Sequence, residues 1–302
     1  MAPSPVTHRI VLADGVELSA DLWLPATASS DTPAPGVVMC HGFSATRHMA
    51  LPAFATAFAD AGLAVCLYDH RGLGASGGGP RQTIDPWQQS LDMREVVGWF
   101  EQRPEVDGGR LALWGSSFSG GEAIVVGAVD DRISAVVANA PFAGLGDLAE
   151  GDTDTADARF AAIAAVLRGE RPRPEPRPIG PLAVVLEPGS EEAAMLPQEE
   201  SSEWFLANGP GTGWENRCTL VMSDDPPFDP ASCAAHVAPA ALLMVVAAED
   251  RVAPAEVALA TYERASEPKQ LEVVPGHHFV DYHGNSQAHA VAVMTEFLLA
   301  HL

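Results

Sequence analysis

Ser117 has the sequence surroundings of a nucleophile. It lies in the segment Trp114-Gly115-Ser116-Ser117-Phe118-Ser119-Gly120-Gly121, after an apolar run and at the start of a helical pattern. A sharp turn from strand into helix would lift its hydroxyl above the strand end, and small neighbours are needed because strand and helix nearly touch there. The common pattern is G-x-S-x-G, whereas this chain has Ser119 in the fifth position and Gly120 next. The segment predicts a reactive serine, and the alternative is a turn that merely joins two elements.

A carboxylate follows a later apolar run. Asp250 comes after that run and before a helix start at Pro254. A serine hydroxyl needs a base to take its proton, and the base needs a carboxylate to orient it. We expect Asp250 to supply that carboxylate, although it could instead cap the following helix. Glu249 is the alternative acid, but its side chain should point away if that of Asp250 points inward.

A pair of histidines follows the next apolar run. His277 and His278 come directly after Val273-Val274-Pro275-Gly276, so the order along the chain is Ser, Asp, His. In an α/β sheet the carboxyl ends of the strands share one edge, where these side chains could meet. We expect His278 to be the base, with His277 as the second choice. His283 is expected to be a surface or cap-facing residue.

An early strand end offers hydrogen-bond donors for an oxyanion. The run 37–40 is followed by His41-Gly42-Phe43, and Gly42 lets the backbone approach a ligand closely. The backbone N–H groups of Phe43 and Phe118 would then converge on one oxygen, and each such donor contributes about 10²–10³ in rate. We expect His41 to hold this loop in place and not to carry a proton.

A second Gly-rich turn lies at residues 69–77. Its sequence, Asp69-His70-Arg71-Gly72-Leu73-Gly74-Ala75-Ser76-Gly77, follows another apolar run. A phosphate cradle is one interpretation, but the next helix starts too late for a dinucleotide fingerprint. We expect Asp69 and Arg71 to form an ion pair that braces the turn.

Apolar runs alternate with helical patterns along the chain. An initial hairpin, 7–12 and 16–23, turns at Asp14-Gly15. The later runs lie at 37–40, 63–68, 111–114, 133–137, 242–246 and 271–274. Most of them are apolar on both faces, which is typical of parallel strands covered by helices on each side. Helix starts are expected at Asp85-Pro86 and at Pro254, and a last helix ends the chain. The pattern predicts the α/β class with a mostly parallel sheet.

One long segment breaks this alternation. From residue 142 to residue 235 the sequence is rich in Pro, Gly and acidic pairs, and a structureless loop of that length is improbable in a compact domain. We expect an inserted cap at 142–235 and a core formed by 1–141 and 236–302. Short helices are expected at Asp157–Leu167 and Glu191–Phe205. The aromatic residues of this segment would either line a pocket or anchor the cap on the sheet: Trp204, Phe205 and Trp214.

Composition narrows the classes of function. The 302 residues include 40 Asp and Glu against 17 Lys and Arg, a net charge of -23. Such an excess argues against binding to nucleic acid or to anionic membranes. No apolar run reaches the roughly 18 residues of a membrane span, and no signal peptide is evident, so a cytoplasmic protein is expected. Cys40 and Cys66 are expected to be buried thiols; Cys218 and Cys233 could pair, although nothing requires it.

Taken together, these motifs resemble the α/β-hydrolase superfamily over nearly the whole chain. The resemblance is carried by His-Gly-Phe at 41–43, the turn at 69–76, the elbow at 115–120, Asp250 and His278. Within the superfamily the chain is similar to the branch near dienelactone-hydrolase and prolyl-peptidase-like enzymes, which includes acyl-processing enzymes of polyketide and other specialised metabolism. The resemblance implies a small-molecule acyl substrate, which could be carrier-bound, and no metal or organic cofactor.

The resemblance also implies a choice of reactions. Members hydrolyse esters, thioesters or amides, and some transfer an acyl group or eliminate a carboxylate. We expect Ser117 to attack an acyl carbonyl while His278 takes its proton and Asp250 orients His278. An acyltransferase or a carboxylate-eliminating enzyme would use the same three residues. A binding module without catalysis is the alternative from another class, although the presence of all three residues disfavours it.

Overall fold

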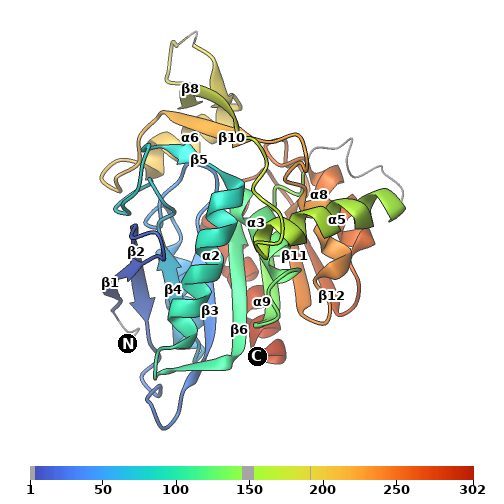
Figure 1. Ribbon diagram of the computed structural model, residues 1–302. Coiled ribbons are helices and arrows are strands. Elements are labelled where there is room, and N and C mark those ends of the chain that lie inside the picture. The colour runs from blue at the N-terminus through green and yellow to red at the C-terminus, as the bar shows by residue number, and fades with distance from the viewer. Residues whose placement is uncertain (1–3, 145–152, 191) are drawn as a thin grey trace.

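The computed structural model describes residues 4–144, 153–190 and 192–302, and within them an eight-stranded sheet carries the other elements (Figure 1). The strand order is β1-β2-β4-β3-β6-β7-β11-β12. The strands are β1 (Val6–Val11), β2 (Glu17–Trp23), β3 (Ala34–Cys40), β4 (Ala64–Tyr68), β6 (Val106–Ser116), β7 (Ile133–Asn139), β11 (Ala241–Ala247) and β12 (Lys269–Val274). Strand β2 is antiparallel to β1 and β4, and the other neighbouring pairs are parallel. The predicted α/β class with a mostly parallel sheet is confirmed.

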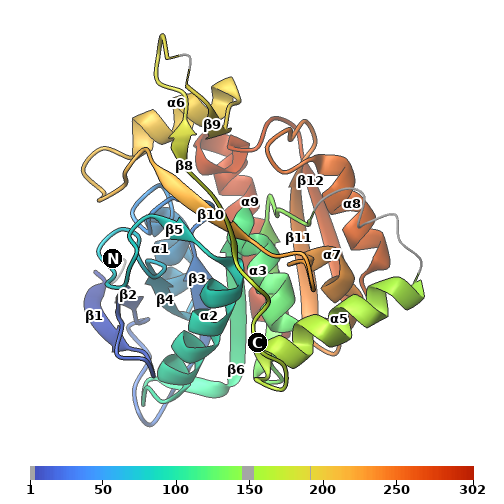
Figure 2. The same ribbon diagram turned by 45° about the horizontal axis from the view of Figure 1, so that its top comes forward.

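Helices cover both faces of this sheet (Figures 1 and 2). One face carries α1 (Pro52–Asp60) and α9 (Gly284–His301), and the other carries α2 (Pro86–Glu101), α3 (Phe118–Gly127) and α8 (Ala255–Arg264), with α5 (Thr153–Leu167) and α7 (Pro230–Cys233) packed beside them. Two 3₁₀ turns, η1 (Ala234–His236) and η2 (Val280–Tyr282), complete the set. Because both faces are covered, every residue of β4 and β11 is buried, which explains their continuous apolar sequences.

The helix starts expected from the sequence are confirmed. The Asp85 carboxylate accepts the backbone N–H groups of Trp87 and Gln88 at 3.1 and 3.2 Å, so it caps α2, and Pro86 occupies the first turn. Proline is suited to that position because its missing N–H would have no partner there. Helix α8 begins directly after Pro254.

A second sheet lies beyond the carboxyl ends of the central strands (Figure 2). Its order is β5-β10-β8-β9, with β5 (Thr83–Ile84), β8 (Arg177–Val185), β9 (Ala194–Leu196) and β10 (Cys218–Met222), and α6 (Glu199–Asn208) follows β9. Strand β5 precedes α2 in the chain and pairs in parallel with β10. The inserted segment is therefore joined to the rest of the chain by backbone hydrogen bonds.

One of the two helices expected in this segment is confirmed, because α5 includes residues 157–167. The other expectation, Glu191–Phe205, is wrong in its first half: residues 194–196 form β9, α6 begins only at Glu199, and Glu191 lies outside the described residues. Strand β8 could not be predicted from its sequence, because its first residues are exposed and include two prolines and so lack the apolar run of a core strand.

The expected ion pair between Asp69 and Arg71 is wrong, since each residue has other partners. The Asp69 carboxylate turns inward, accepts the N–H of Arg47 at 2.8 Å and that of Ala75 at 2.9 Å, and pairs with the Arg47 guanidinium. Arg71 reaches outward and donates two bonds of 2.8 Å to Asp92 of α2. The loop itself encloses the Asp69 carboxylate, and Arg71 is left to pair across to the helix.

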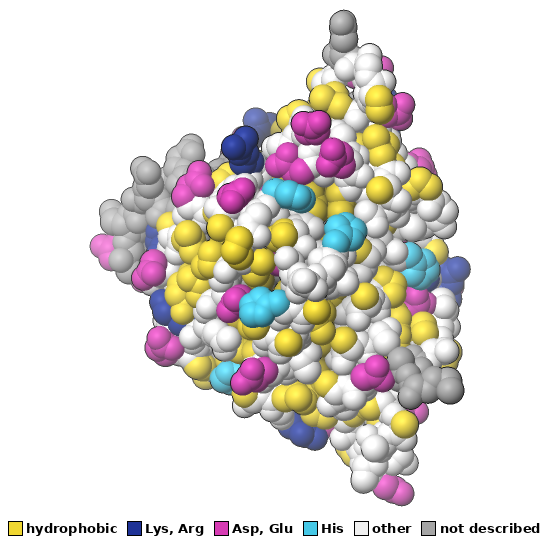
Figure 3. All heavy atoms as spheres, turned by 180° about the vertical axis from the view of Figure 1, so that it is seen from behind, with side chains coloured by type: hydrophobic (Ala, Val, Ile, Leu, Met, Phe, Trp, Pro, Cys, Tyr) yellow, Lys and Arg dark blue, Asp and Glu magenta, His cyan; other side chains and the backbone are white. Residues whose placement is uncertain are grey.

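The surface carries the acidic excess. On the face opposite to that of Figure 1, Asp and Glu side chains are scattered among few Lys and Arg (Figure 3). None of the helices in the described ranges is long and apolar enough to cross a membrane. The four cysteines, Cys40, Cys66, Cys218 and Cys233, are all buried and unpaired, so the optional disulfide is not formed.

We expect Arg47→Ala to lower the free energy of unfolding by about 3 to 5 kcal/mol, because the buried carboxylates of Asp21 and Asp69 both lose the guanidinium that pairs with them. Arg110→Ala is the control, since its pair with Asp107 is exposed and should cost less than about 1 kcal/mol. Urea titrations followed by circular dichroism measure both values. Equal losses of unfolding free energy in the two variants would contradict the role of Arg47 as the charged partner of Asp21 and Asp69.

Candidate active site

Ser117 occupies a strained turn between β6 and α3. Its φ of +53° and ψ of -114° are unusual for a residue with a side chain. Several bonds hold it there: its N–H donates to the Asn139 carbonyl at 2.8 Å, and its carbonyl accepts the N–H groups of Gly120 and Phe142, each at 2.9 Å. Observed strain of this kind concentrates at functional sites.

Glycines make the turn possible. A Cβ on Gly115 would lie 1.9 Å from the Ser119 carbonyl oxygen, and one on Gly121 would lie 2.2 Å from the Phe142 carbonyl oxygen. These distances are far below any tolerable contact, so side chains are excluded at both positions. The small residues around Ser117 therefore have the steric role that the sequence predicted.

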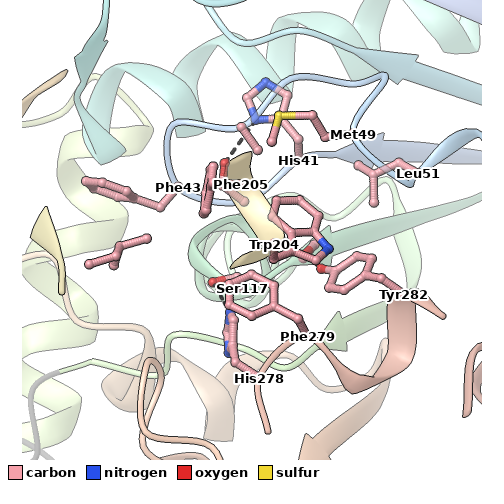
Figure 4. Close-up of a pocket in the computed structure, with 14 residues that line it drawn as sticks. His41, Phe43, Met49, Leu51, Ser117, Trp204, Phe205, His278, Phe279 and Tyr282 are labelled. Atoms are coloured by element: carbon pink, nitrogen blue, oxygen red, sulfur yellow. Dashed lines mark hydrogen bonds between the residues drawn. The ribbon is translucent and has the colours of Figure 1, made fainter. Parts of the chain in front are cut away.

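Three side chains from separate strand ends form one hydrogen-bonded chain, and Figure 4 shows two of them, Ser117 and His278. The Ser117 Oγ lies 2.9 Å from His278 Nε2, and His278 Nδ1 lies 2.5 Å from Asp250 Oδ2. The second Asp250 oxygen accepts the N–H groups of Val252 and Ala253, each at 2.9 Å, so the same carboxylate also fixes the loop before α8. With Nδ1–H donating to Asp250, we assign Nε2 as the acceptor of the Ser117 hydroxyl proton.

The alternative residues lie away from this chain. Glu249 and His277 are exposed, and the Nδ1 of His277 accepts the N–H of Phe279 at 3.2 Å. His283 is exposed at the start of α9. The structure thus brings together Ser117 and His278 with Asp250, and not with their sequence neighbours.

The predicted oxyanion residues flank Ser117. A Cβ on Gly42 would lie 3.0 Å from the Ser117 Cβ, so the loop after β3 passes in contact with the turn. The rings of Phe43 and Phe118 pack edge to face with centroids 5.6 Å apart. Phe118 is the first residue of α3, and the first N–H groups of a helix have no partner within it. This arrangement leaves backbone donors available beside Ser117.

A buried polar network lies under the turn, and sequence reasoning missed it. The Ser119 hydroxyl donates to the His41 carbonyl at 2.6 Å and lies 2.7 Å from Glu122 Oε2 and 2.9 Å from His70 Nε2. His41 Nε2 accepts the backbone N–H of His70 at 3.1 Å, as expected for a loop-holding residue. The available signals were Ser119 in place of the usual glycine and Glu122 within an otherwise apolar helix.

Burial favours the uncharged forms of the two titratable groups in this network. It raises the pKa of the fully buried Glu122 carboxyl well above its usual range and lowers the pKa of His70 well below its usual range. A protonated Glu122 can donate to Ser119 while Ser119 donates to His41. These hydrogen bonds link the turn to the loop after β3.

Two cavities meet at Ser117. One, of about 20 Å³, is lined by several aromatic side chains and by His278; the other, of about 270 Å³, lies on the side of Phe118. Trp204 and Phe205 line the smaller cavity and also anchor α6, because Trp204 stacks on Phe279 with centroids 4.9 Å apart. Trp214 packs on Phe205 and lines neither cavity. Trp204 and Phe205 therefore line a cavity and also anchor the inserted segment, whereas Trp214 packs against Phe205.

Asp281 is a further buried carboxyl group near the site, and sequence reasoning did not indicate it. It is 1% exposed, and neither of its oxygens has a hydrogen-bond partner among the described residues. Burial raises its pKa from 3.8 to about 6, although His289 and His278 nearby oppose that change. Apart from such isolated groups, the described ranges contain no cluster of three or more His, Cys, Asp or Glu that could hold a metal.

We expect Asp281→Asn to stabilise the protein at pH 8 by about 2 kcal/mol. A pKa of about 6 in the folded chain, above the ordinary 3.8, means that the native state binds the proton more tightly. Ionisation therefore destabilises the parent as the pH rises through this range, and below about pH 4 the advantage of the variant disappears. Urea titrations at pH 4 and pH 8 measure it.

The control for that experiment is Asp107→Asn. The hydrogen bond from Arg110 lowers the pKa of Asp107, so its ionised form is favoured by folding and the substitution should bring no gain at pH 8. A parent chain as stable as the Asp281→Asn variant at pH 8 would show that Asp281 carries no penalty for its charge.

The chain is similar to several known proteins in sequence and in fold. Residues 14–280 match the X-Pro dipeptidyl-peptidase (S15) family. The polyketide transferase grgF of a Penicillium species is 29% identical over 251 residues, 82% of each chain. The thiohydrolase aneE of Aspergillus aculeatus is 28% identical over 269 residues, 87% of this chain and 83% of its own. The crystal structure of the alpha/beta hydrolase GrgF from Penicillium sp. sh18 superposes with a TM-score of 0.73 at 26% identity, covering 98% of both chains.

The family match spans most of the chain, and the structural match includes the central sheet and its helices. The fold, the order of the site residues along the chain and the relatives lead to the same assignment. The chain belongs to the X-Pro dipeptidyl-peptidase (S15) family and is a serine hydrolase with the α/β-hydrolase fold.

Proposed function

We propose that this enzyme cleaves acyl esters or thioesters through an acyl-enzyme on Ser117. The observation that carries the proposal is the continuous chain from the Ser117 hydroxyl through His278 to Asp250, with both contacts at hydrogen-bond length. A base within reach of a hydroxyl, itself oriented by a carboxylate, is the arrangement that nucleophilic catalysis requires. The thiohydrolase among the relatives supports a thioester as one substrate.

The geometry supports the following steps. The Ser117 oxygen bonds to the acyl carbon while its proton passes to His278 Nε2, and the Asp250 carboxylate stabilises the imidazolium that results. The N–H groups of Phe43 and Phe118 hold the oxyanion. His278 then donates the proton to the departing alcohol or thiol. Water, deprotonated by His278, attacks the acyl carbon, the acid leaves, and the proton returns to Ser117.

We propose that residues 142–235 act as a cap over this site, with 1–141 and 236–302 as the core. Support comes from Leu196, Trp204 and Leu220, which lie in the inserted segment and line the cavities beside Ser117. A cap that shields the reacting atoms from water strengthens the electrostatic interactions in the site. Substrate choice would then depend on the segment whose structure the sequence predicted least well.

Acyl transfer is the second candidate. The same residues would serve, with an alcohol or amine in place of water in the second step. The observation that favours it is the smaller cavity, which is lined largely by aromatic side chains and adjoins His278, where an organic nucleophile would bind. The polyketide transferase among the relatives points the same way, and we place the reaction with the acyl compounds of specialised, polyketide-type metabolism.

We expect Ser117→Ala to abolish labelling by a fluorophosphonate probe, because the probe bonds to the activated hydroxyl. Asp250→Asn should lower kcat for p-nitrophenyl butyrate by about 10⁴-fold, since the amide favours the wrong tautomer of His278. Ser116→Ala is the control, because that hydroxyl is engaged by the hydroxyl of Tyr282 and labelling should persist. Labelling of the Ser117→Ala variant at the parental rate would show that another residue is the nucleophile.

A second measurement separates hydrolysis from transfer. With a thioester substrate and an added short-chain alcohol, a hydrolase releases mainly free acid, whereas a transferase releases mainly the new ester. We expect free acid to be the main product, and chromatography of the products measures the ratio. If the ester is the main product, the enzyme is an acyltransferase and not a hydrolase, and Ser117 remains the proposed nucleophile.

A further inference from the structure

The two cavities beside Ser117 have different relations to the base. They share Phe43, Ser117 and Leu196, so both open onto the reacting oxygen. His278 lines only the smaller cavity, together with Trp204, Phe279 and Tyr282, and Figure 4 labels all four side chains. The larger cavity extends from Phe118 to the loop after β10 and does not include His278.

The position of the base decides which part of a substrate lies on each side. His278 Nε2 must give its proton to the departing heteroatom and later take one from the attacking heteroatom. Both heteroatoms must therefore lie on the side of the smaller cavity, within reach of the imidazole. The acyl chain, which exchanges no proton, is left with the larger cavity on the side of Phe118.

The lining of the larger cavity sets the chemistry of the acyl group. The described residues that line it include no Asp, Glu, Lys or Arg, although the chain as a whole carries a net charge of -23. Most of its side chains are apolar, among them Phe142, Met195 and Met222. The hydroxyl of Ser223 is already engaged, since it accepts the Trp87 Nε1–H at 2.8 Å and donates to the Pro226 carbonyl at 2.9 Å. A charged group placed here would lose its hydration without a partner.

The smaller cavity also has an uncharged lining, but it offers far less space. The described residues that line it include no Asp, Glu, Lys or Arg, and Met49 and Leu51 close it opposite the aromatic rings. Its volume of about 20 Å³, against about 270 Å³ for the larger cavity, leaves room only for a compact, uncharged group. Among the described residues, neither cavity offers a carboxylate to the ammonium group of a free peptide N-terminus, so an X-Pro peptide would find no charged partner on either side.

We propose that the substrate is an ester or thioester with a long, apolar, uncharged acyl chain, held in the larger cavity, and a compact uncharged leaving group, held in the smaller one. This inference rests on the proposed function, because it assumes that Ser117 is acylated and that His278 transfers the protons. It goes further by naming the substrate class and by assigning each cavity to one half of the substrate.

The test measures two series of substrates with the parent enzyme and with two variants, one substituted in each cavity. The acyl series is p-nitrophenyl acetate, hexanoate and decanoate, and the leaving-group series is phenyl and 1-naphthyl hexanoate. Met222→Trp fills the larger cavity and should lower kcat/KM for the decanoate at least about tenfold while changing that for the acetate less than about threefold. Met49→Ala widens the smaller cavity and should raise the naphthyl-to-phenyl ratio at least about fivefold without changing the acyl profile.

Two further substrates test the charge argument. The mono-p-nitrophenyl ester of decanedioic acid, which places a carboxylate at the far end of the acyl chain, should react at least about tenfold more slowly than the decanoate. An Ala-Pro p-nitroanilide, which carries a free ammonium group, should not be cleaved at a measurable rate. Each variant is checked by thermal unfolding, and Leu220→Trp and Leu51→Ala replace a variant that does not fold.

The outcomes separate this inference from the function on which it rests. A reversed pattern, in which Met222→Trp changes the leaving-group ratio and Met49→Ala changes the acyl profile, would overturn the assignment of the cavities while leaving the serine hydrolase intact. Faster reaction of the carboxylated ester, or cleavage of the Ala-Pro substrate, would overturn the substrate class. A parent enzyme that hydrolyses no ester and takes up no fluorophosphonate would overturn the proposed function itself.

Discussion

The backbone of Ser117 is the constraint on which the rest of the site depends. Its positive φ costs about 1–3 kcal/mol and persists only where the surroundings over-determine it. Gly115 and Gly121 leave no room for a Cβ, and the loop after β3 touches the turn at Gly42. Ser119, which stands where such turns usually have glycine, adds a hydrogen bond to the His41 carbonyl. The turn and the loop after β3 are thus held as one unit, in which the position of the proposed nucleophile fixes that of the proposed oxyanion donors.

The surroundings of Ser117 are largely uncharged, and the Asp250 carboxylate is the charged group that the proposed mechanism uses. Under the turn, burial raises the pKa of Glu122 and lowers that of His70, which favours the uncharged form of both groups. The described residues that line the cavities above Ser117 include no Asp, Glu, Lys or Arg. Such surroundings of low dielectric strengthen the interaction between the Asp250 carboxylate and an imidazolium at His278. The many acidic residues of the chain lie mostly on the surface, in contact with water and away from His278.

Much of the fold and the candidate residues could be predicted because their signals are local. A strand covered on both faces appears as an apolar run, and the side chain that follows it lies at the carboxyl edge of the sheet. This reasoning placed Ser117, Asp250 and His278 on one edge before any distance was known. The choice between His277 and His278 was harder, because it depends on which of two neighbours points inward, and only the structure shows His278 buried and His277 exposed.

The remaining features could not be predicted because they depend on partners distant in the chain. Asp69 pairs with Arg47 and not with Arg71, since the fold encloses its carboxylate beside another loop. Strand β8 forms by pairing with β10, and its sequence contains no apolar run that would predict this pairing. The two cavities are formed by the core and the inserted segment together, so their chemistry appears only when both are in place.

The most direct test of the account is to find the covalent intermediate. The enzyme is mixed with a slowly deacylating long-chain thioester, quenched in acid within milliseconds, digested, and its peptides are sequenced by mass spectrometry. The account predicts one acyl group per chain, on the oxygen of Ser117, at a level that falls as the free acid appears. Product formation with no acylated peptide, or with the acyl group on a different residue, would contradict it.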